Sequence, residues 1–228
     1  MSRFRFYILP RLVLGLSVLA LLGGLWVLWR SLGAPLPTAE LACRRAETAY
    51  FQPHGRTVAS GPVRFREAES HCDAWMVRRS GDELSVIELE RTAGLLWKEV
   101  SLWSLSREDA PLYVVTADTA PIWDWEDGTD ATEILPLAVC TDPAAVRVEI
   151  TALWLGHWET DVQAALAGRG VSTELRHVGD QVWSGESLSV PHATPPEGTT
   201  SSSQTLYLFG RAYDADGNLL AVYDPTVD

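Results

Sequence analysis

The chain has no acidic residue before Glu40, although its 228 residues include 30 acids. The basic residues of this N-terminal part are Arg3, Arg5, Arg11 and Arg30. Residues 12–29 carry no charge, and as a helix they span about 27 Å, close to the hydrocarbon thickness of a bilayer. This pattern predicts a transmembrane helix over residues 12–30 that contacts the lipid bilayer through residues 12–29.

The charges that flank this apolar run predict its orientation. Three arginines precede the run, whereas a mixture of basic and acidic residues follows it. The positive-inside tendency therefore predicts a cytoplasmic tip over residues 1–11 and an extracytoplasmic remainder. A cleaved secretory signal is the alternative, because Ser31-Leu32-Gly33 has small residues at the spacing of a cleavage site. The length of the run and the charge of Arg30 favour an uncleaved, single-pass anchor in the cell membrane.

Basic residues are also scarce beyond the anchor, where 14 of the 18 lie together with all 30 acids. The part of the chain after residue 30 therefore has a net charge of about −16. Nucleic acid and anionic lipid surfaces repel such a charge, so we expect no nucleic-acid partner. An envelope protein or a glycan is the kind of partner that fits this composition.

Cysteine is rare, with only Cys43, Cys72 and Cys140. Outside the cytosol three cysteines allow one disulfide, with three alternative pairings and one thiol left over, or no disulfide at all. No pair has the spacing of a metal site, and we expect no cofactor.

Long amphipathic helices are missing from residues 31–228. A juxtamembrane linker over residues 31–53 contains Pro35 and Pro37 and then a short helix, capped by Thr38 and running to about Tyr50. Residues 54–228 read as one β domain. Its predicted strands lie at 75–79, 84–91, 95–105, 112–116, 146–154, 171–178, 206–209 and 219–223, with a short helical turn at 160–166.

The spacing of these strands predicts the fold class. Eight to eleven short strands, separated by turn signals every 8–12 residues or so, favour an antiparallel β-sandwich. We therefore predict a mainly β protein in which a single N-terminal transmembrane helix is followed by an extracytoplasmic β-sandwich-like domain.

Familiar catalytic motifs are absent. The chain has no nucleophile elbow, no paired-histidine zinc helix and no phosphate-binding glycine loop. A cysteine-dependent enzyme built on Cys72 is the weaker alternative, since a nucleophilic thiol needs a nearby base such as His157 or His177. His71 is a poor base for Cys72, because adjacent residues of a strand point to opposite faces. We expect no catalytic residues and no enzymatic activity.

The segment Tyr213-Asp214-Ala215-Asp216-Gly217-Asn218-Leu219 resembles one unit of the YD-repeat family, in which this pattern closes a β-hairpin. The resemblance covers about a dozen residues and occurs once, whereas that family repeats the unit many times. It therefore implies a hairpin and no activity. Asp214, Asp216 and Asn218 also alternate as in the beginning of a calcium loop, but a tight turn at Asp216-Gly217 explains them as well.

A second acidic segment is the best candidate for a binding site. Between Arg107 and Arg147 the chain has nine acids and no basic residue. Indole rings can stack on sugars while carboxylates bind hydroxyl groups or a cation, but strand alternation could equally bury both tryptophans in the core. The predicted binding residues are Trp123, Asp124, Trp125, Glu126, Asp127 and Asp130.

These observations predict a non-catalytic, membrane-anchored binding or interaction protein of the cell envelope. A carbohydrate- or cation-binding module centred on residues 123–130 is the alternative.

Overall fold

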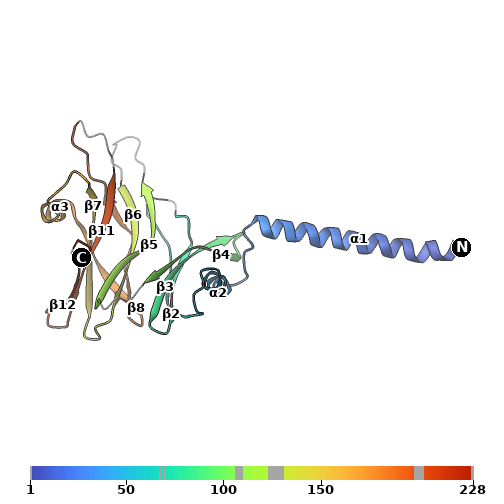
Figure 1. Ribbon diagram of the computed structural model, residues 1–228, viewed down its shortest axis with the longest axis horizontal. Coiled ribbons are helices and arrows are strands. Elements are labelled where there is room, and N and C mark those ends of the chain that lie inside the picture. The colour runs from blue at the N-terminus through green and yellow to red at the C-terminus, as the bar shows by residue number, and fades with distance from the viewer. Residues whose placement is uncertain are drawn as a thin grey trace.

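The computed structural model describes residues 2–66, 68, 70–105, 110–122, 131–197 and 203–226. The described part of the chain is mainly β, all of its paired strands run antiparallel, and one long apolar helix lies at the N-terminus. These three features confirm the coarse prediction from the sequence. Figure 1 shows the helix projecting away from the β-rich part of the molecule.

Two helices form the N-terminal part. Helix α1 (Ser2–Ser31) contains one segment, Arg11–Ser31, that is long and apolar enough to cross a membrane, and none of its most apolar stretch is buried against the protein. Helix α2 (Ala39–Ala49) begins at Thr38, whose Oγ1 accepts a hydrogen bond of 3.2 Å from Leu41 N. This cap is the one predicted from the sequence.

The first sheet is a four-stranded meander in which neighbours in sequence are neighbours in space. Helix α2 covers one face of this sheet, and small residues of the helix pack on aliphatic residues of β3. Its strands are β1 (Arg56–Pro62), β2 (Ala74–Ser80), β3 (Glu83–Thr92) and β4 (Leu96–Leu105).

The second sheet has eight strands. Seven of them follow the order β10-β6-β9-β8-β7-β11-β12, and the eighth, β5, lies outside this order and pairs with β6. The sheet curls, so that β5 packs against β11 and β12. A short helix, α3 (Val162–Arg169), follows β7. The strands are β5 (Leu112–Ile122), β6 (Ala131–Cys140), β7 (Arg147–Gly156), β8 (Val171–Gly179), β9 (Val182–Ser184), β10 (Leu188–Pro191), β11 (Gln204–Tyr213) and β12 (Leu219–Tyr223).

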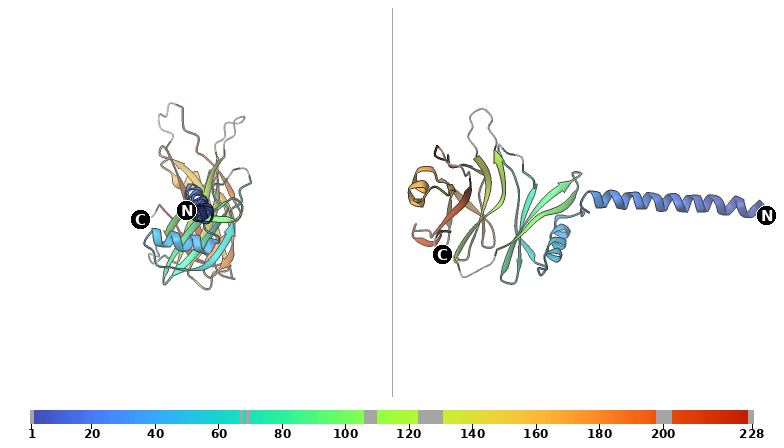
Figure 2. Two further views of the ribbon diagram at one scale, coloured as in Figure 1. Left: turned by 90° about the vertical axis from the view of Figure 1, so that its right-hand side faces the viewer. Right: turned by 45° about the horizontal axis from the view of Figure 1, so that its top comes forward.

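Strand β6 lies at the centre of the packing, because both of its faces are covered. Leu135, Leu137 and Val139 contact the cluster formed with the first sheet. Ala138 and Cys140 point the other way, into the curled part of the second sheet. The right-hand view of Figure 2 shows the same succession of α2, first sheet and second sheet.

The two sheets also approach closely at one edge. Gly179 of β8 lies so near β1 that a Cβ atom there would be 2.3 Å from Val58 O. Beside it, Asp180 Oδ2 forms an ion pair of 3.0 Å with Arg79 Nη1 of β2. Only glycine fits at residue 179, and the Arg79–Asp180 ion pair adds a second contact between the two sheets.

The predicted strands are recovered with changes at their ends. The turn expected near residues 80–83 joins β2 and β3, and the alternating segment 146–154 corresponds to β7. Strand β5 continues to Ile122, beyond the predicted end at 116. The described residues contain twelve strands rather than eight to eleven, and β1, β6, β9 and β10 lie outside the predicted ranges. Strand β6 is almost continuously buried, and β9 and β10 are only three and four residues long, so these strands show little alternation in sequence.

Candidate functional site

The best site predicted from the sequence lies outside the described residues. Trp123, Asp124, Trp125, Glu126, Asp127 and Asp130 follow the last residue of β5 and precede the first residue of β6. The last described pair of these two strands is Ile122 with Ala131. A binding role of this segment therefore stays a prediction from the sequence.

A groove of about 890 Å³ lies between β1 and strands β8 and β9. Its floor is the indole of Trp75, which is buried. Gly61 permits this position, because a Cβ at residue 61 would be 2.8 Å from the Trp75 ring. The remaining lining is Ser60, Pro62, Arg64, Phe65, Arg66, Leu135, Thr173, Glu174, Arg176, Val178, Ser184, Gly185, Glu186 and Ser187.

Three arginines make this groove more basic than the acidic chain around it. Arg66 Nη2 lies 2.6 Å from Glu186 Oε2, and Arg176 Nη2 lies 3.9 Å from Glu186 Oε1. Arg64 is exposed and has no ion pair among the described residues. Volumes of 300–1,000 Å³ with an apolar floor and a few polar groups are typical of small-ligand sites. The sequence-based interpretation missed this groove because its two walls are over a hundred residues apart in the chain.

A buried side chain holds one wall of the groove in place. Glu133 of β6 accepts backbone N–H groups from Arg66 at 2.7 Å and Ala68 at 3.3 Å. Its side chain is only 2% exposed. The segment after β1 is thereby fixed over β6, which positions Arg66 at the rim.

A second cluster lies between the two sheets and joins Cys72, Glu88 and Asp118. Their sulfur and carboxylate oxygens lie within 4.8 Å of one another, and all three residues are buried. Cys72 Sγ donates to Asp118 Oδ2 at 3.1 Å, and Ser70 Oγ donates to the same oxygen at 2.5 Å. Ser101 Oγ donates to Glu88 Oε2 at 2.6 Å.

Irregular strand pairing brings the two carboxylates together. The pairing of β5 with β6 shifts between Thr116 and Asp118, and that of β3 with β4 shifts between Glu88 and Leu89. Such bulges redirect side chains. These three residues are the described group that could converge on a metal ion, but each already has a hydrogen-bond partner.

The chemistry of this cluster opposes the cysteine-nucleophile hypothesis. Burial and then the hydrogen bond to Asp118 raise the pKa of the Cys72 thiol. No histidine among the described residues is hydrogen-bonded to Cys72, since His157 contacts Ser203 O and His177 contacts Asp180 O. Burial also raises the pKa of Glu88, and the nearby charge of Asp118 adds to this effect. The thiol therefore stays protonated, whereas a nucleophile requires the thiolate.

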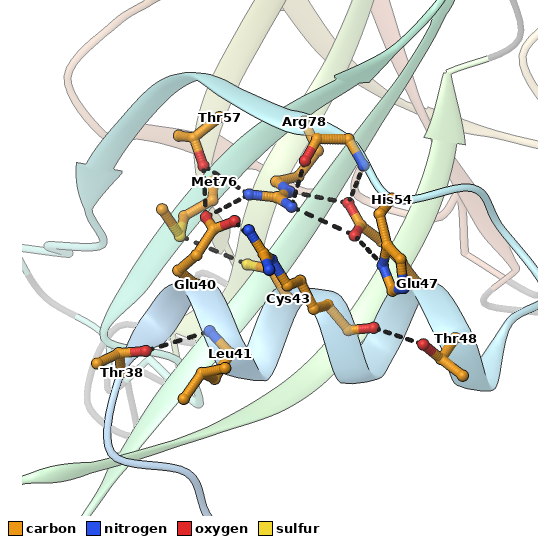
Figure 3. A network of polar contacts seen from close by, with 12 residues as sticks. Thr38, Glu40, Leu41, Cys43, Glu47, Thr48, His54, Thr57, Met76 and Arg78 are labelled. Carbon is orange, nitrogen blue, oxygen red and sulfur yellow. Dashed lines mark hydrogen bonds and ion pairs between the residues drawn. The ribbon is translucent and has the colours of Figure 1, made fainter.

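A third network, centred on Arg78, is structural (Figure 3). The guanidinium is 1% exposed and donates from Nε to Glu47 Oε1 at 2.8 Å, and it also pairs with Glu40. Thr57 Oγ1 and Gly55 O accept further hydrogen bonds. Burial alone would raise the pKa of Glu47, but hydrogen bonds from Arg78 and from the Gly55 amide hold it below its usual value. This network fastens α2 to the first sheet.

The cysteines and the last hairpin complete the predicted features. Cys43, Cys72 and Cys140 are all free thiols and lie in three separate core clusters.

Asp214 accepts hydrogen bonds from the backbone N–H groups of Asp216 and Asn218, and Gly217 has φ +83°. The segment is thus a hydrogen-bonded turn, as the resemblance implied, whose carboxylate is occupied by the turn itself.

Comparison of the chain with known protein families, with curated proteins and with solved structures gives no match. The class that the structure defines is a mainly β protein with antiparallel sheets and one apolar N-terminal helix.

Proposed function

We propose that this protein is a single-pass membrane protein whose sandwich-like β domain binds another component of the cell envelope without catalysis. In this proposal the N-terminus is cytoplasmic and the β domain is extracytoplasmic. The observation that carries it is the exposure of helix α1. The most apolar 18 residues within Arg11–Ser31 have a mean hydropathy of 2.3, and none of that stretch is covered by the rest of the chain. A helix that is apolar on every side needs another apolar environment, and lipid supplies one.

The connection between the helix and the β domain supports a tether that holds the domain close to the membrane. Trp29 Nε1 donates to Pro35 O at 2.9 Å, across the end of the helix. Leu36 and Trp97 exchange two backbone hydrogen bonds of 2.7 Å. Arg45 of α2 donates to Ala34 O. The segment between α1 and the first sheet is therefore an ordered joint.

The groove over Trp75 is the described surface best suited to binding. Its arginines favour a carboxylate or phosphate group on the partner, because guanidinium groups bind such anions in two-pronged geometry. We expect the acidic segment 123–130 to be a separate contact for a sugar or a cation. If neither calcium nor wall glycans change the tryptophan fluorescence or the melting temperature of the protein, the result contradicts the proposed binding of a sugar or cation by residues 123–130.

Three measurements on the producing cells test the anchor and its orientation. An uncleaved anchor leaves the chain in the pellet after alkaline carbonate extraction, with an intact mass that includes residue 1. Protease added outside the cell should digest the β domain. A chain that is released by carbonate, or that has lost its first thirty or so residues, would contradict the anchor.

Crosslinking in cells followed by purification of the full chain tests the binding role. Arg64→Ser and Arg176→Ser remove charge from the groove, while Arg211→Ser is a matched control on an exposed residue of β11. We expect the two groove variants to lose the crosslinked partner and the control to retain it. Equal recovery with all three variants would exclude the groove as the binding site.

A further inference from the structure

The hairpin tip between β3 and β4 has an unusual composition for a turn exposed to water. Thr92-Ala93-Gly94-Leu95-Leu96-Trp97 contains no charged residue and lies between Arg91 and Lys98. Ala93 and Gly94 make the turn with φ angles of 52° and 72°. The side chain of Leu95 at this tip is 79% exposed.

The preceding hairpin of the same sheet provides the comparison. Its tip, Ser80-Gly81-Asp82-Glu83, has the polar residues and glycine that are usual in turns facing water. The two tips lie at opposite ends of strand β3, which runs from Glu83 to Thr92. The sheet therefore has one polar end and one apolar end.

The apolar end is the one that adjoins helix α1. Residue Leu36, five positions after the helix, pairs through its backbone with Trp97 at the start of β4. Gly33 lies against the Lys98 side chain, since a Cβ at residue 33 would be 3.5 Å from Lys98 Cδ. Figures 1 and 2 show β4 beside the C-terminal end of α1. The tip is thus at the level where the apolar helix ends.

We propose that this tip, residues 92–97, inserts into the outer interface of the lipid bilayer beside α1. The inference rests on the membrane anchor proposed above, and it adds a second contact between the protein and the membrane. Lipid is the occupant that the geometry favours, because the joint at Leu36 holds the tip next to a helix that is itself covered by lipid.

The residues that flank the tip match the chemistry of a membrane interface. The Arg91 guanidinium lies 4.6 Å from the centre of the Trp97 ring, and Lys98 Nζ lies 2.8 Å from Glu90 Oε2. Tryptophan and the long basic side chains are enriched at the depth of lipid headgroups. Trp29 and Arg30 are a similar pair of side chains at the end of α1. Apolar residues at the tip and basic residues behind it would thus be in contact with acyl chains and headgroups, respectively.

A fluorescent probe on the full-length chain tests this proposal. Leu95→Cys, labelled with the environment-sensitive dye NBD, is compared with Glu83→Cys at the polar end of the same strand. The three native cysteines are buried, so the unsubstituted chain measures background labelling. The chains are placed in vesicles of phosphatidylcholine, a lipid without net charge, with and without lipids that carry a nitroxide quencher on the acyl chain.

We expect the probe at residue 95 to show blue-shifted emission and loss of intensity with the nitroxide lipids, and the probe at residue 83 to show neither. Identical spectra at both positions, in chains that resist carbonate extraction, would overturn the insertion while leaving the anchor intact. A blue shift at residue 95 without quenching would also overturn it, in favour of a protein contact. Release of the chains by carbonate would overturn the anchor, and the insertion with it.

Discussion

Arg78 Nε lies 2.8 Å from Glu47 Oε1, and both side chains are only 1% exposed. The pair links β2 to α2, and through α2 it stabilises the sheet face next to the joint with α1. A buried carboxylate without a partner costs free energy, and a displacement of α2 would leave Glu47 without Arg78. The pair therefore favours one position of α2 on the sheet.

Removal of the arginine should therefore destabilise the fold strongly. We expect Arg78→Met to lower the free energy of unfolding by about 3–5 kcal/mol, the usual cost when one partner of a buried ion pair is removed. Urea unfolding of the full chain in detergent, followed by tryptophan fluorescence, measures this change. Arg44→Met, in an exposed pair with Glu40, is the control, with an expected loss below about 1 kcal/mol. Similar losses for both variants would show that burial of the Arg78 pair has no special role.

The same pair predicts how stability depends on acid pH. The pKa of Glu47 in the folded chain is below its ordinary value of 4.5, so folding favours the ionised carboxylate. The stabilisation is complete above the unfolded pKa and is lost as the pH falls through the folded pKa. We expect the free energy of unfolding, measured with urea below about pH 4.5, to fall less steeply with decreasing pH in Glu47→Gln than in the unsubstituted chain. The same dependence on acid pH in both chains would contradict a lowered pKa of Glu47.

Glu88 should show the opposite dependence. Burial, with the charge of Asp118, raises the folded pKa of Glu88 above its ordinary value of 4.5. The stability that it contributes is complete below the unfolded pKa and is lost as the pH rises through the folded pKa. We expect Glu88→Gln, which keeps an oxygen that accepts from Ser101, to gain stability relative to the unsubstituted chain across this window. A constant difference between the two chains from about pH 4 to about pH 8 would exclude a buried, titrating Glu88.

The thiols should be unreactive in the folded chain. All three are free and buried. Burial raises the pKa of the Cys43 thiol to about 12, and it also raises the pKa values of the Cys72 and Cys140 thiols. We expect iodoacetamide near neutral pH to leave the folded chain unmodified and to label all three cysteines after unfolding in urea. Intact-mass spectrometry counts the labels and also shows whether a disulfide has formed. Selective, rapid labelling of Cys72 in the folded chain would support the cysteine-dependent enzyme instead.

The close approach of the sheets at Gly179 gives a test by substitution. In Gly179→Ala the new Cβ would be 2.3 Å from Val58 O, and a backbone oxygen cannot rotate away. We expect a loss of about 1–3 kcal/mol in the free energy of unfolding, which is typical of overpacking. Gly168→Ala is the control, because no atom lies within 4 Å of a Cβ at this position in α3. There alanine should add about 0.5–1 kcal/mol through helix propensity. An equal gain for both variants would contradict the close contact.

Local patterns predicted much of the fold correctly. Thr38 predicted the beginning of α2, the polar turn after Arg79 predicted the β2–β3 hairpin, and the alternation after Val146 predicted β7. Strand β6 was missed because nearly all of its residues are buried and both faces are covered, so that no polar face alternates with the core. The pairing of Asp118 with Cys72 was missed as well, because it depends on a bulge and on the packing of two sheets.

Features that depend on a few consecutive residues could be predicted from the amino-acid sequence. The apolar run of α1, the caps and turns and the mainly β character follow from composition and periodicity, which operate within one element. Which elements contact one another became clear only in the folded molecule. Its tertiary structure assembled the groove over Trp75, buried Arg78 against Glu47, separated the three cysteines and put the apolar β3–β4 tip beside the end of α1. These contacts join residues that are distant in the chain, and the order of strands in a sheet cannot be read from the pattern of any single strand.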